Sequence, residues 1–343
     1  MNKMSKDKQT LKIHIKTKVY KNMNYNFIPQ GSTVKAKKEV LYLDVGNALK
    51  KGIIDHHQPS APKLCATMLV YKYPQYISKK IKTIVLHKSP DLDCIASSFL
   101  VEYYLKYKRF PKYAYKLATF VNKIDFGKSP KYTISLYSLF TMIKSELKTD
   151  TDIVKFGHKL IKECSKYGFD TNKVPPVYKD YVEKIKNDKK LYDNDFKKSK
   201  VILLNLPFKN HKDTIQTKCL VSVQPKSKLF KEWARNDSIH SKEGFCMLIV
   251  QLHSRRTIIS VKPDGFVYLK GLGEMINKWE KIKREKKGII LDEPNRVGYD
   301  MPDPWYDGRN LLHNYTIIDS PMRGTELTFD EIVDIVIRWS ENV

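Results

Sequence analysis

The sequence predicts an α/β protein in which a mainly parallel sheet with flanking helices is followed by a smaller α/β C-terminal domain. Two observations carry this prediction. Short apolar runs of strand-forming residues end in polar residues and precede stretches with helical spacing, and a charged segment divides the chain into two such parts. The chain has 343 residues, enough for one large or two medium domains.

The first part alternates apolar runs with helical patterns. Residues 11–20 alternate polar and apolar side chains, which predicts a half-buried strand within a basic N-terminal extension over 1–39. Further strands are expected where short apolar runs occur, at 40–45, 52–54, 82–87 and 116–125. Apolar residues at helical spacing predict helices over 63–73, 91–107, 134–147 and 151–164, the last with Thr149 or Asp150 as its cap.

A linker is expected at 187–200, because this segment is charged and poor in apolar residues. It separates a predicted domain over 40–190 from a second domain over 201–343. In the second domain, the runs at 201–206, 246–253, 257–263 and 265–271 predict a sheet, residues 279–287 an exposed helix end, and residues 302–310 a tight loop.

Composition excludes some classes of protein and favours others. Lys and Arg total 63 against 37 acidic residues, a formal charge of +26, which favours polyanionic partners over a merely solvated surface of a Lys-biased chain. No run approaches the roughly 20 apolar residues of a membrane span, so no membrane partner is expected. Five cysteines without zinc-site spacing argue against a disulfide scaffold, and the first ten residues lead into no apolar signal region. We therefore expect a cytoplasmic protein; self-association stays open.

Acidic and histidine side chains follow the strand-like runs between residues 44 and 125. They are Asp44, Asp55, His56, His57, His87, Asp91, Asp93 and Asp125. The carboxyl ends of parallel strands form ligand sites, and carboxylates and imidazoles bind divalent cations. Two cations about 3.5–4 Å apart can hold the attacking and leaving oxygens of a displacement at phosphorus. A single Asp after a strand is usually a turn or cap residue, but the joint set favours a shared metal site.

Two segments carry a family resemblance. IIDHHQP resembles the signature of the DHH phosphoesterase superfamily, and HKSPDLDCIASS resembles its other hallmark. That superfamily includes RecJ-type nucleases, nanoribonucleases, cyclic-dinucleotide phosphodiesterases and manganese inorganic pyrophosphatases, and the DVG…DHHQ pair resembles Myg-type exonucleases. The order is permuted, because Asp44 and DHH precede the HxxxDxD segment that comes first in the family.

The resemblance implies two Mn²⁺ ions, with Mg²⁺ as the alternative, and a bridging hydroxide as nucleophile. It assigns His87 and Asp93 to one ion, Asp91, His56 and Asp125 to the other, and Asp44 to both. His57 would face a substrate phosphate and Asp55 would orient the histidines, so these two are the catalytic candidates.

The 11-residue step from Asp44 to Asp55 leaves two alternatives. It is short for a helical crossover between parallel strands, which takes about a dozen residues or more. An antiparallel hairpin would place Asp44 and Asp55 at opposite ends of their strands and would remove Asp44 from the site.

The second domain offers cationic substrate-binding candidates. They are Arg255, Arg256, Lys262, Arg309 and Arg323, and the alternative for each is a surface charge or an ion pair. Arginine suits bidentate phosphate recognition. The Gly-Gly-Gly-His segment of DHH enzymes is absent. Trp305 and Tyr306 are expected either to stack a base or to anchor their loop.

The expected function is a metal-dependent phosphoesterase that hydrolyses phosphodiester bonds in oligonucleotide or nucleotide-like substrates. The alternatives are a hydrolase of pyrophosphate or polyphosphate and a non-catalytic nucleic-acid-binding module. Both substrate classes are polyanions, so the net charge of the chain does not separate them.

Overall fold

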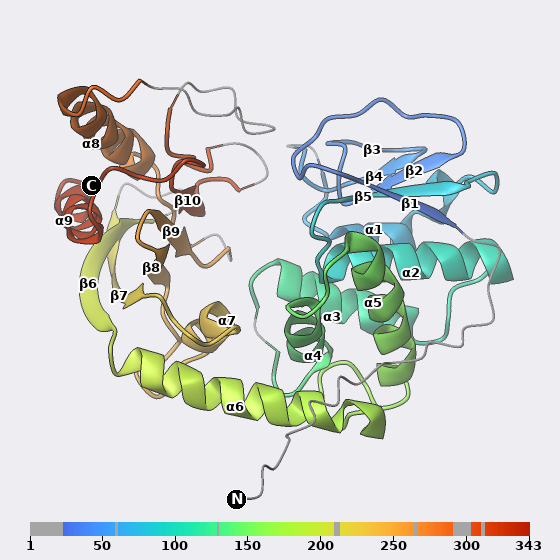
Figure 1. Ribbon diagram of the computed structural model, residues 1–343. Coiled ribbons are helices and arrows are strands. Elements are labelled where there is room, and N and C mark those ends of the chain that lie inside the picture. Colours follow the sequence, from blue (N-terminus) through green and yellow to red (C-terminus); the bar gives the residue numbers. More distant parts are fainter. Residues whose placement is uncertain are drawn as a thin grey trace, which may run out of the picture.

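The computed structural model describes residues 23–58, 61–128, 130–208, 213–263, 266–290, 303–309 and 313–343. The predicted strand at 11–20 lies outside these residues. Two lobes, each built on a five-stranded sheet, are connected by the long helix α6 (Lys179–Phe196), as Figure 1 shows. The fold is therefore α/β with mixed sheets and flanking helices. None of the helices in the described ranges is both long and apolar enough to span a membrane.

The first sheet is mainly parallel. Its strands lie in the order β1 (Asn24–Ile28), β5 (Thr83–His87), β2 (Val40–Leu43), β4 (Ile53–Ile54) and β3 (Leu49–Lys50). The first four are parallel to one another, and β3 runs antiparallel to β4. Strand β1, which the sequence analysis did not predict, is an edge strand of this sheet.

The short strand β3 resolves the alternatives for the step from Asp44 to Asp55. The chain turns back after β2, runs antiparallel through β3 and turns again, so β4 lies parallel to β2. Asp44 and Asp55 therefore both follow the carboxyl ends of their strands. The first turn uses Gly46 at φ +123°, where a Cβ would lie 2.8 Å from Val34 Cγ2 and 2.9 Å from Ile53 Cγ2.

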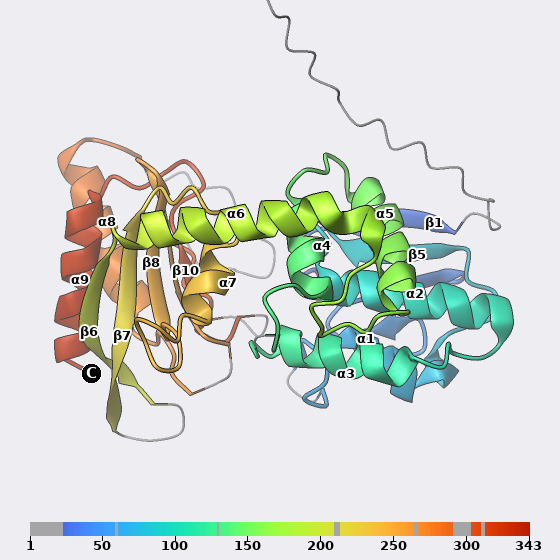
Figure 2. The same cartoon turned by 90° about the horizontal axis from the view of Figure 1, so that it is seen from below.

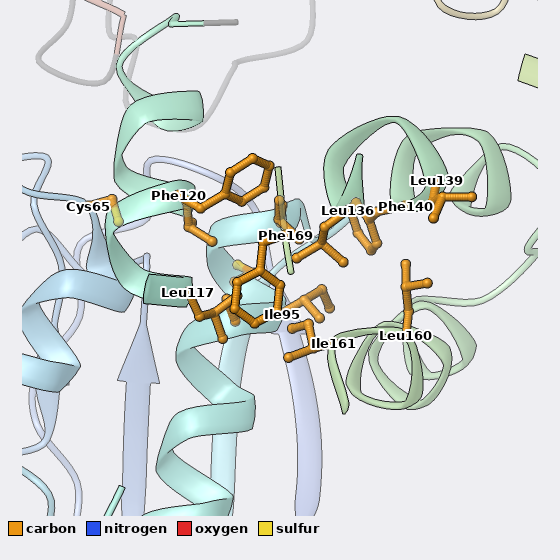
Figure 3. Close-up of a cluster of buried hydrophobic side chains, with 14 of the residues drawn as sticks. Cys65, Ile95, Leu117, Phe120, Leu136, Leu139, Phe140, Leu160, Ile161 and Phe169 are labelled. Atoms are coloured by element: carbon orange, nitrogen blue, oxygen red, sulfur yellow. The ribbon is translucent and has the colours of Figure 1, made fainter. Parts of the chain in front are cut away.

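Five α-helices and two short 3₁₀ turns complete the described part of the first lobe. They are α1 (Ala66–Lys72), η1 (Pro74–Tyr76), α2 (Leu92–Tyr107), α3 (Ala114–Asp125), α4 (Leu136–Lys144), α5 (Asp150–Cys164) and η2 (Pro176–Tyr178). The helices gather on one face of the sheet and bury an apolar core with it (Figure 3). The other face carries a smaller cluster around Tyr42 and Val85. Thr149 caps α5 by accepting a hydrogen bond from the Asp152 amide, as predicted.

The predicted strand at 116–125 is wrong, because this segment forms helix α3. Leu117, Phe120 and Val121 recur at helical spacing and bury one face of α3. Asp125 is consequently the last residue of a helix. It does not follow a strand.

The second lobe holds a mixed sheet between helices. Its strands lie in the order β10 (Ile317–Asp319), β9 (Arg256–Val261), β8 (Met247–His253), β7 (Thr214–Val223) and β6 (Lys200–Pro207). Only β7 and β8 pair in parallel among these strands. Helices α8 (Leu272–Lys286) and α9 (Phe329–Glu341) lie on one face, and α7 (Phe230–Arg235) lies on the other. The strand expected at 265–271 is wrong in its described part, where Val267 forms only an isolated bridge with Phe208.

The predicted linker at 187–200 is also wrong, since residues 187–196 belong to α6. This helix runs along both lobes (Figure 2). Its Asp188 is buried and accepts hydrogen bonds from Ser227 Oγ, the amides of Lys228 and Leu229, and Trp233 Nε1. One hydrophobic cluster runs from the first lobe through α6 into the second. Asp195 is buried as well, whereas Lys190, Asp193, Lys197 and Lys198, which also suggested a linker, are exposed.

Candidate metal centre

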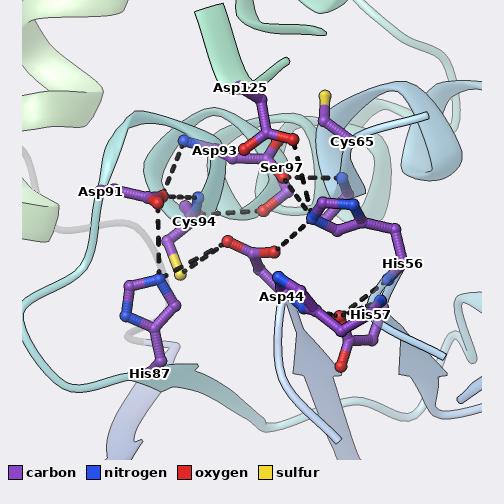
Figure 4. A network of polar contacts seen from close by, with 12 residues as sticks. Asp44, His56, His57, Cys65, His87, Asp91, Asp93, Cys94, Ser97 and Asp125 are labelled. Atoms are coloured by element: carbon purple, nitrogen blue, oxygen red, sulfur yellow. Dashed lines mark hydrogen bonds and ion pairs between the residues drawn. The ribbon is translucent and has the colours of Figure 1, made fainter. Parts of the chain in front are cut away.

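The six predicted metal ligands come together at the carboxyl ends of the first sheet's strands (Figure 4). Asp44 and His56 follow β2 and β4, and His87 ends β5. Asp91 and Asp93 occupy the start of α2, and Asp125 reaches the site from the end of α3. Three parallel strands and two helices thus converge at one edge.

Asp44 lies at the centre of the cluster. It is 2% exposed and has a φ of +57°, a left-handed conformation that aspartate adopts more readily than most residues. Its Oδ1 lies 3.1 Å from His56 Nε2, and its Oδ2 lies 3.5 Å from His87 Nε2. The two oxygens of one carboxylate therefore face imidazoles on opposite sides.

Donor atoms within 4.8 Å of one another form three groups among the described residues. The His87 group contains Asp44, His87, Asp91 and Cys94, and the His56 group contains His56, Asp93 and Asp125. The third group, Asp44, Asp55, His56 and His57, overlaps both of these through Asp44 and His56. The resemblance assigned Asp93 to His87 and Asp91 to His56, and the structure groups them the other way. His87 Nε2 lies 3.6 Å from Asp91 Oδ2, whereas His56 Nε2 lies 3.9 Å from Asp93 Oδ2 and 3.7 Å from Asp125 Oδ2.

The first turn of α2 explains this exchange. Asp91 is the N-cap and accepts hydrogen bonds from the amides of Asp93 and Cys94, which holds its carboxylate beside β5. Asp93 lies inside the helix and turns toward α1, where it accepts hydrogen bonds from the amides of Ala66 and Thr67. Asp93 therefore also caps α1, and its side chain serves the fold as well as the site.

The Asp55-His56-His57 segment is held by its first residue. The Asp55 carboxylate is 1% exposed and accepts hydrogen bonds from the amides of Asn47 and His56 at 2.6 and 2.7 Å. Asp55 Oδ1 also lies 2.6 Å from His57 Nδ1. This contact fixes the ring of His57 and favours a proton on its Nδ1. Asp55 thus occupies the orienting position that the resemblance implies.

The pKa values of the cluster reflect crowded carboxylates. Burial lowers the pKa of His56, but the hydrogen bond that His56 donates to Asp44 and the charges of Asp125, Asp44 and Asp93 outweigh it and raise the pKa to about 10. Burial and the Asp44 charge raise the pKa of Asp93 to about 6, and burial and the Asp93 charge raise that of Asp125. The Asp44 pKa falls despite burial, because His56 and His87 contact its carboxylate. A cation among these oxygens would favour their ionised forms.

His87 provides an independent sign that the cluster fits a metal ion. Its side chain is 4% exposed, and its buried Nε2 has no hydrogen-bond partner. Its Nδ1 lies 2.9 Å from the carbonyl oxygen of Lys88, which orients the ring toward the donor group. Buried polar atoms without a partner are rare in folded proteins, and a ligated ion would satisfy this one.

The predicted cationic residues lie in different places. Lys262 lines a pocket of about 240 Å³ between the lobes, opposite Asp91, Asp93 and Asp125. Three of the four predicted arginines form ion pairs with carboxylates of the second lobe. Arg255 pairs with Glu326, Arg256 with Asp319, and Arg309 with Asp307. Arg323 is exposed between β10 and α9. Trp305 is fully buried with its Nε1 donating to Glu280, so it anchors its loop and stacks no base.

Sequence reasoning missed two features of this pocket. Lys231, at the start of α7, is exposed and lines the pocket together with Lys128 of the first lobe. Tyr137 Oη donates a hydrogen bond to Glu232 Oε1 at 3.0 Å and so joins α4 to α7 beside it. Neither residue belongs to a motif, and only the packing of the two lobes identifies them.

The comparisons with known proteins add no assignment. Neither the comparison with protein-family models nor the search of curated proteins gives a match for this chain.

Proposed function

We propose that this protein is a divalent-metal-dependent phosphoesterase of DHH type that hydrolyses phosphodiester bonds in nucleotide-like or oligonucleotide substrates. The observation that supports it most is the position of the Asp44 carboxylate. Its two oxygens face the His87 group and the His56 group, as a carboxylate shared between two ions must.

The donor set suits divalent cations. Carboxylates and neutral imidazoles from Asp44, His56, His87, Asp91, Asp93 and Asp125 would hold the ions, and Mn²⁺ is the expected metal with Mg²⁺ as the alternative. Bound ions would supply positive charge to the phosphate oxygens and activate water at neutral pH. In the reaction, water forms a new bond to phosphorus, the bond to the leaving oxygen breaks, and that oxygen takes a proton.

In the proposed reaction, His57 would contact a phosphate oxygen of the substrate and Asp55 would orient His57. Asp55 holds the His57 ring through Nδ1, so Nε2 remains available to a phosphate oxygen or a proton. His57 also offers a ring nitrogen within 4.8 Å of a ligand atom of Asp44. Its ring therefore lies where a phosphate bound at the proposed centre would be.

The pocket between the lobes supports a polyanionic substrate. Its first-lobe wall carries Asp91, Asp93 and Asp125, and its second-lobe wall carries Lys231 and Lys262. A phosphate group can contact the ions on one side and ammonium groups on the other. Phosphoanhydrides share this chemistry, so pyrophosphate belongs in the test.

The test is hydrolysis of a substrate panel with Mn²⁺, Mg²⁺ or EDTA. The panel contains a generic phosphodiester, short RNA and DNA oligomers, cyclic dinucleotides and pyrophosphate. We expect metal-dependent turnover of a phosphodiester that His56→Asn abolishes. His158→Asn is the matched control, because His158 is 15% exposed against 12% for His56 and also faces a carboxylate, that of Glu102, outside the donor groups.

Turnover of pyrophosphate alone would assign the phosphoanhydride reaction to the same centre. Nucleic-acid binding without turnover under any divalent ion would contradict the proposal and favour a binding module. Equal losses in His56→Asn and His158→Asn would also contradict it, because the effect would then be one of folding.

A further inference from the structure

The His87 donor group contains a sulfur atom. Cys94 is the third residue of α2 and is fully buried, and its Sγ lies 3.6 Å from Asp44 Oδ2. The same Sγ lies within 4.8 Å of donor atoms from His87 and Asp91. In a tetrahedral site with bonds of 2.0 to 2.3 Å, neighbouring donors are about 3.5 Å apart, so a small movement would suffice.

The buried Nε2 of His87, which makes no hydrogen bond, indicates where an ion would lie. His87 Nε2 is buried and lacks a hydrogen bond, and Figure 4 shows its ring beside Cys94 on the side of Asp44 that faces away from His56. A second buried cysteine, Cys65, lies near Asp93, but it belongs to neither donor group among the described residues. The sulfur is therefore specific to the His87 side.

We propose that Cys94 is a metal ligand at the His87 position and makes that position selective for a thiophilic divalent ion such as Zn²⁺, Fe²⁺ or Co²⁺. This inference rests on the metal centre of the proposed function. Thiolate, imidazole and carboxylate together form a donor set for borderline ions, whereas Mg²⁺ and Mn²⁺ prefer oxygen. The group of His56, Asp93 and Asp125 includes no sulfur from any residue that the structure describes, so this position would retain the preference for harder ions.

Ligation requires the thiolate. The bond that forms is between Sγ and the metal, the bond that breaks is S–H, and the proton is released to solvent. Burial raises the pKa of the Cys94 thiol, while the His87 charge opposes the rise. A coordinating metal ion deprotonates a thiol outright, and the amino end of α2 further stabilises the negative sulfur.

The experiment is a titration of the purified full chain with Co²⁺, followed by absorption spectroscopy. A cobalt–thiolate bond produces a sulfur-to-metal charge-transfer band in the near ultraviolet, whether or not the protein hydrolyses anything. We expect the band in the wild type and in Cys65→Ala, and its loss in Cys94→Ala and Cys94→Ser. In a competition titration, Cys94→Ala should bind Zn²⁺ at least about 10-fold more weakly than the wild type. Losing a residue that only supports a metal ligand already weakens metal binding by about this factor, and losing a ligand should weaken it at least as much.

The outcomes separate the two proposals. Bound Co²⁺ without the band in the wild type, or a band that persists in Cys94→Ala, would overturn the role of Cys94 and leave the oxygen and nitrogen donors in place. A band together with an inactive substrate panel would support Cys94 and contradict the phosphoesterase. No Co²⁺ binding at all would overturn the metal centre itself. Cys94→Ser keeps the volume of the side chain, so it guards against loss of folding in the alanine variant.

Discussion

The acidic edge of the first sheet and the arginines of the second lobe are both charged, but their surroundings differ. At the acidic edge, carboxylates crowd one another around Asp44, and the buried Nε2 of His87 makes no hydrogen bond although it lies 3.5 Å from Asp44 Oδ2. In the second lobe, Arg256 lies 3.2 Å from Asp319, and Arg309 contacts Asp307. In the proposed centre, bound cations would balance the first arrangement, whereas the second contains its own counter-charges. A cluster of like-charged side chains is therefore a better indicator of a binding site than charged residues that are paired with each other.

Asp44→Asn tests this comparison with the largest expected effect. The change removes the negative charge shared by both donor groups but keeps the shape of the side chain. Metal ions contribute several kcal/mol of transition-state stabilisation, so kcat/KM should fall by about 10³-fold. Arg256→Ala should change it by less than about 3-fold, since an exposed ion pair contributes little. A loss of similar size in both variants would contradict the comparison.

Asp188→Ala tests whether helix α6 holds the second lobe, and with it the arginines, in place. The variant leaves the buried donors of Ser227, Leu229 and Trp233 without an acceptor. The free energy of unfolding should fall by about 3 kcal/mol or more. Urea denaturation measures it, with Asp193→Ala as control, because Asp193 lies on the same helix and is 51% exposed. Equal stability of the two variants would show that α6 does not hold the second lobe.

Lys231→Ala tests whether a lysine that lines the pocket contributes more to substrate binding than an exposed lysine outside it. Lys231 lines the pocket opposite the acidic residues, and no carboxylate is within ion-pair distance of it among the described contacts. Loss of a charge-assisted hydrogen bond to phosphate costs about 1.5 kcal/mol, so KM should rise by about 10-fold with kcat nearly unchanged. Lys226→Ala, an exposed lysine just before α7, is the control and should leave KM unaltered.

His313→Gln gives the smallest effect and concerns pH. Burial and the charges of His57 and Lys231 lower the pKa of His313 to about 4, and its Nδ1 lies 2.6 Å from Tyr306 Oη. Below its unfolded pKa of about 6.5, the unfolded chain binds a proton that the folded chain excludes. The wild type should therefore lose stability relative to His313→Gln as the pH falls from 6.5 toward 4. Urea midpoints of both proteins across this range measure the difference; parallel midpoints would contradict it.

The sequence predicted which acidic and histidine residues converge better than it predicted the connections between elements. The residues of the HxxxDxD segment are positioned by local elements, a strand end and a helix N-terminus, so their spacing carried the information. The strand expected before Asp125 is a helix, because a short apolar run fits either period. The charged surface of α6 resembled a linker, since Asp188, which carries its contact with the second lobe, is polar. Lys231 has no motif, so only tertiary packing reveals it.

The stoichiometry of bound divalent ions tests the central claim most directly. Equilibrium dialysis of the full chain, followed by elemental analysis, counts the ions held by the wild type and by Asp44→Asn. A carboxylate between two donor groups predicts two ions for each wild-type chain and weakened binding of both in the variant. A wild type that retains no ion, or an Asp44→Asn protein that binds ions as the wild type does, would contradict a centre built on Asp44.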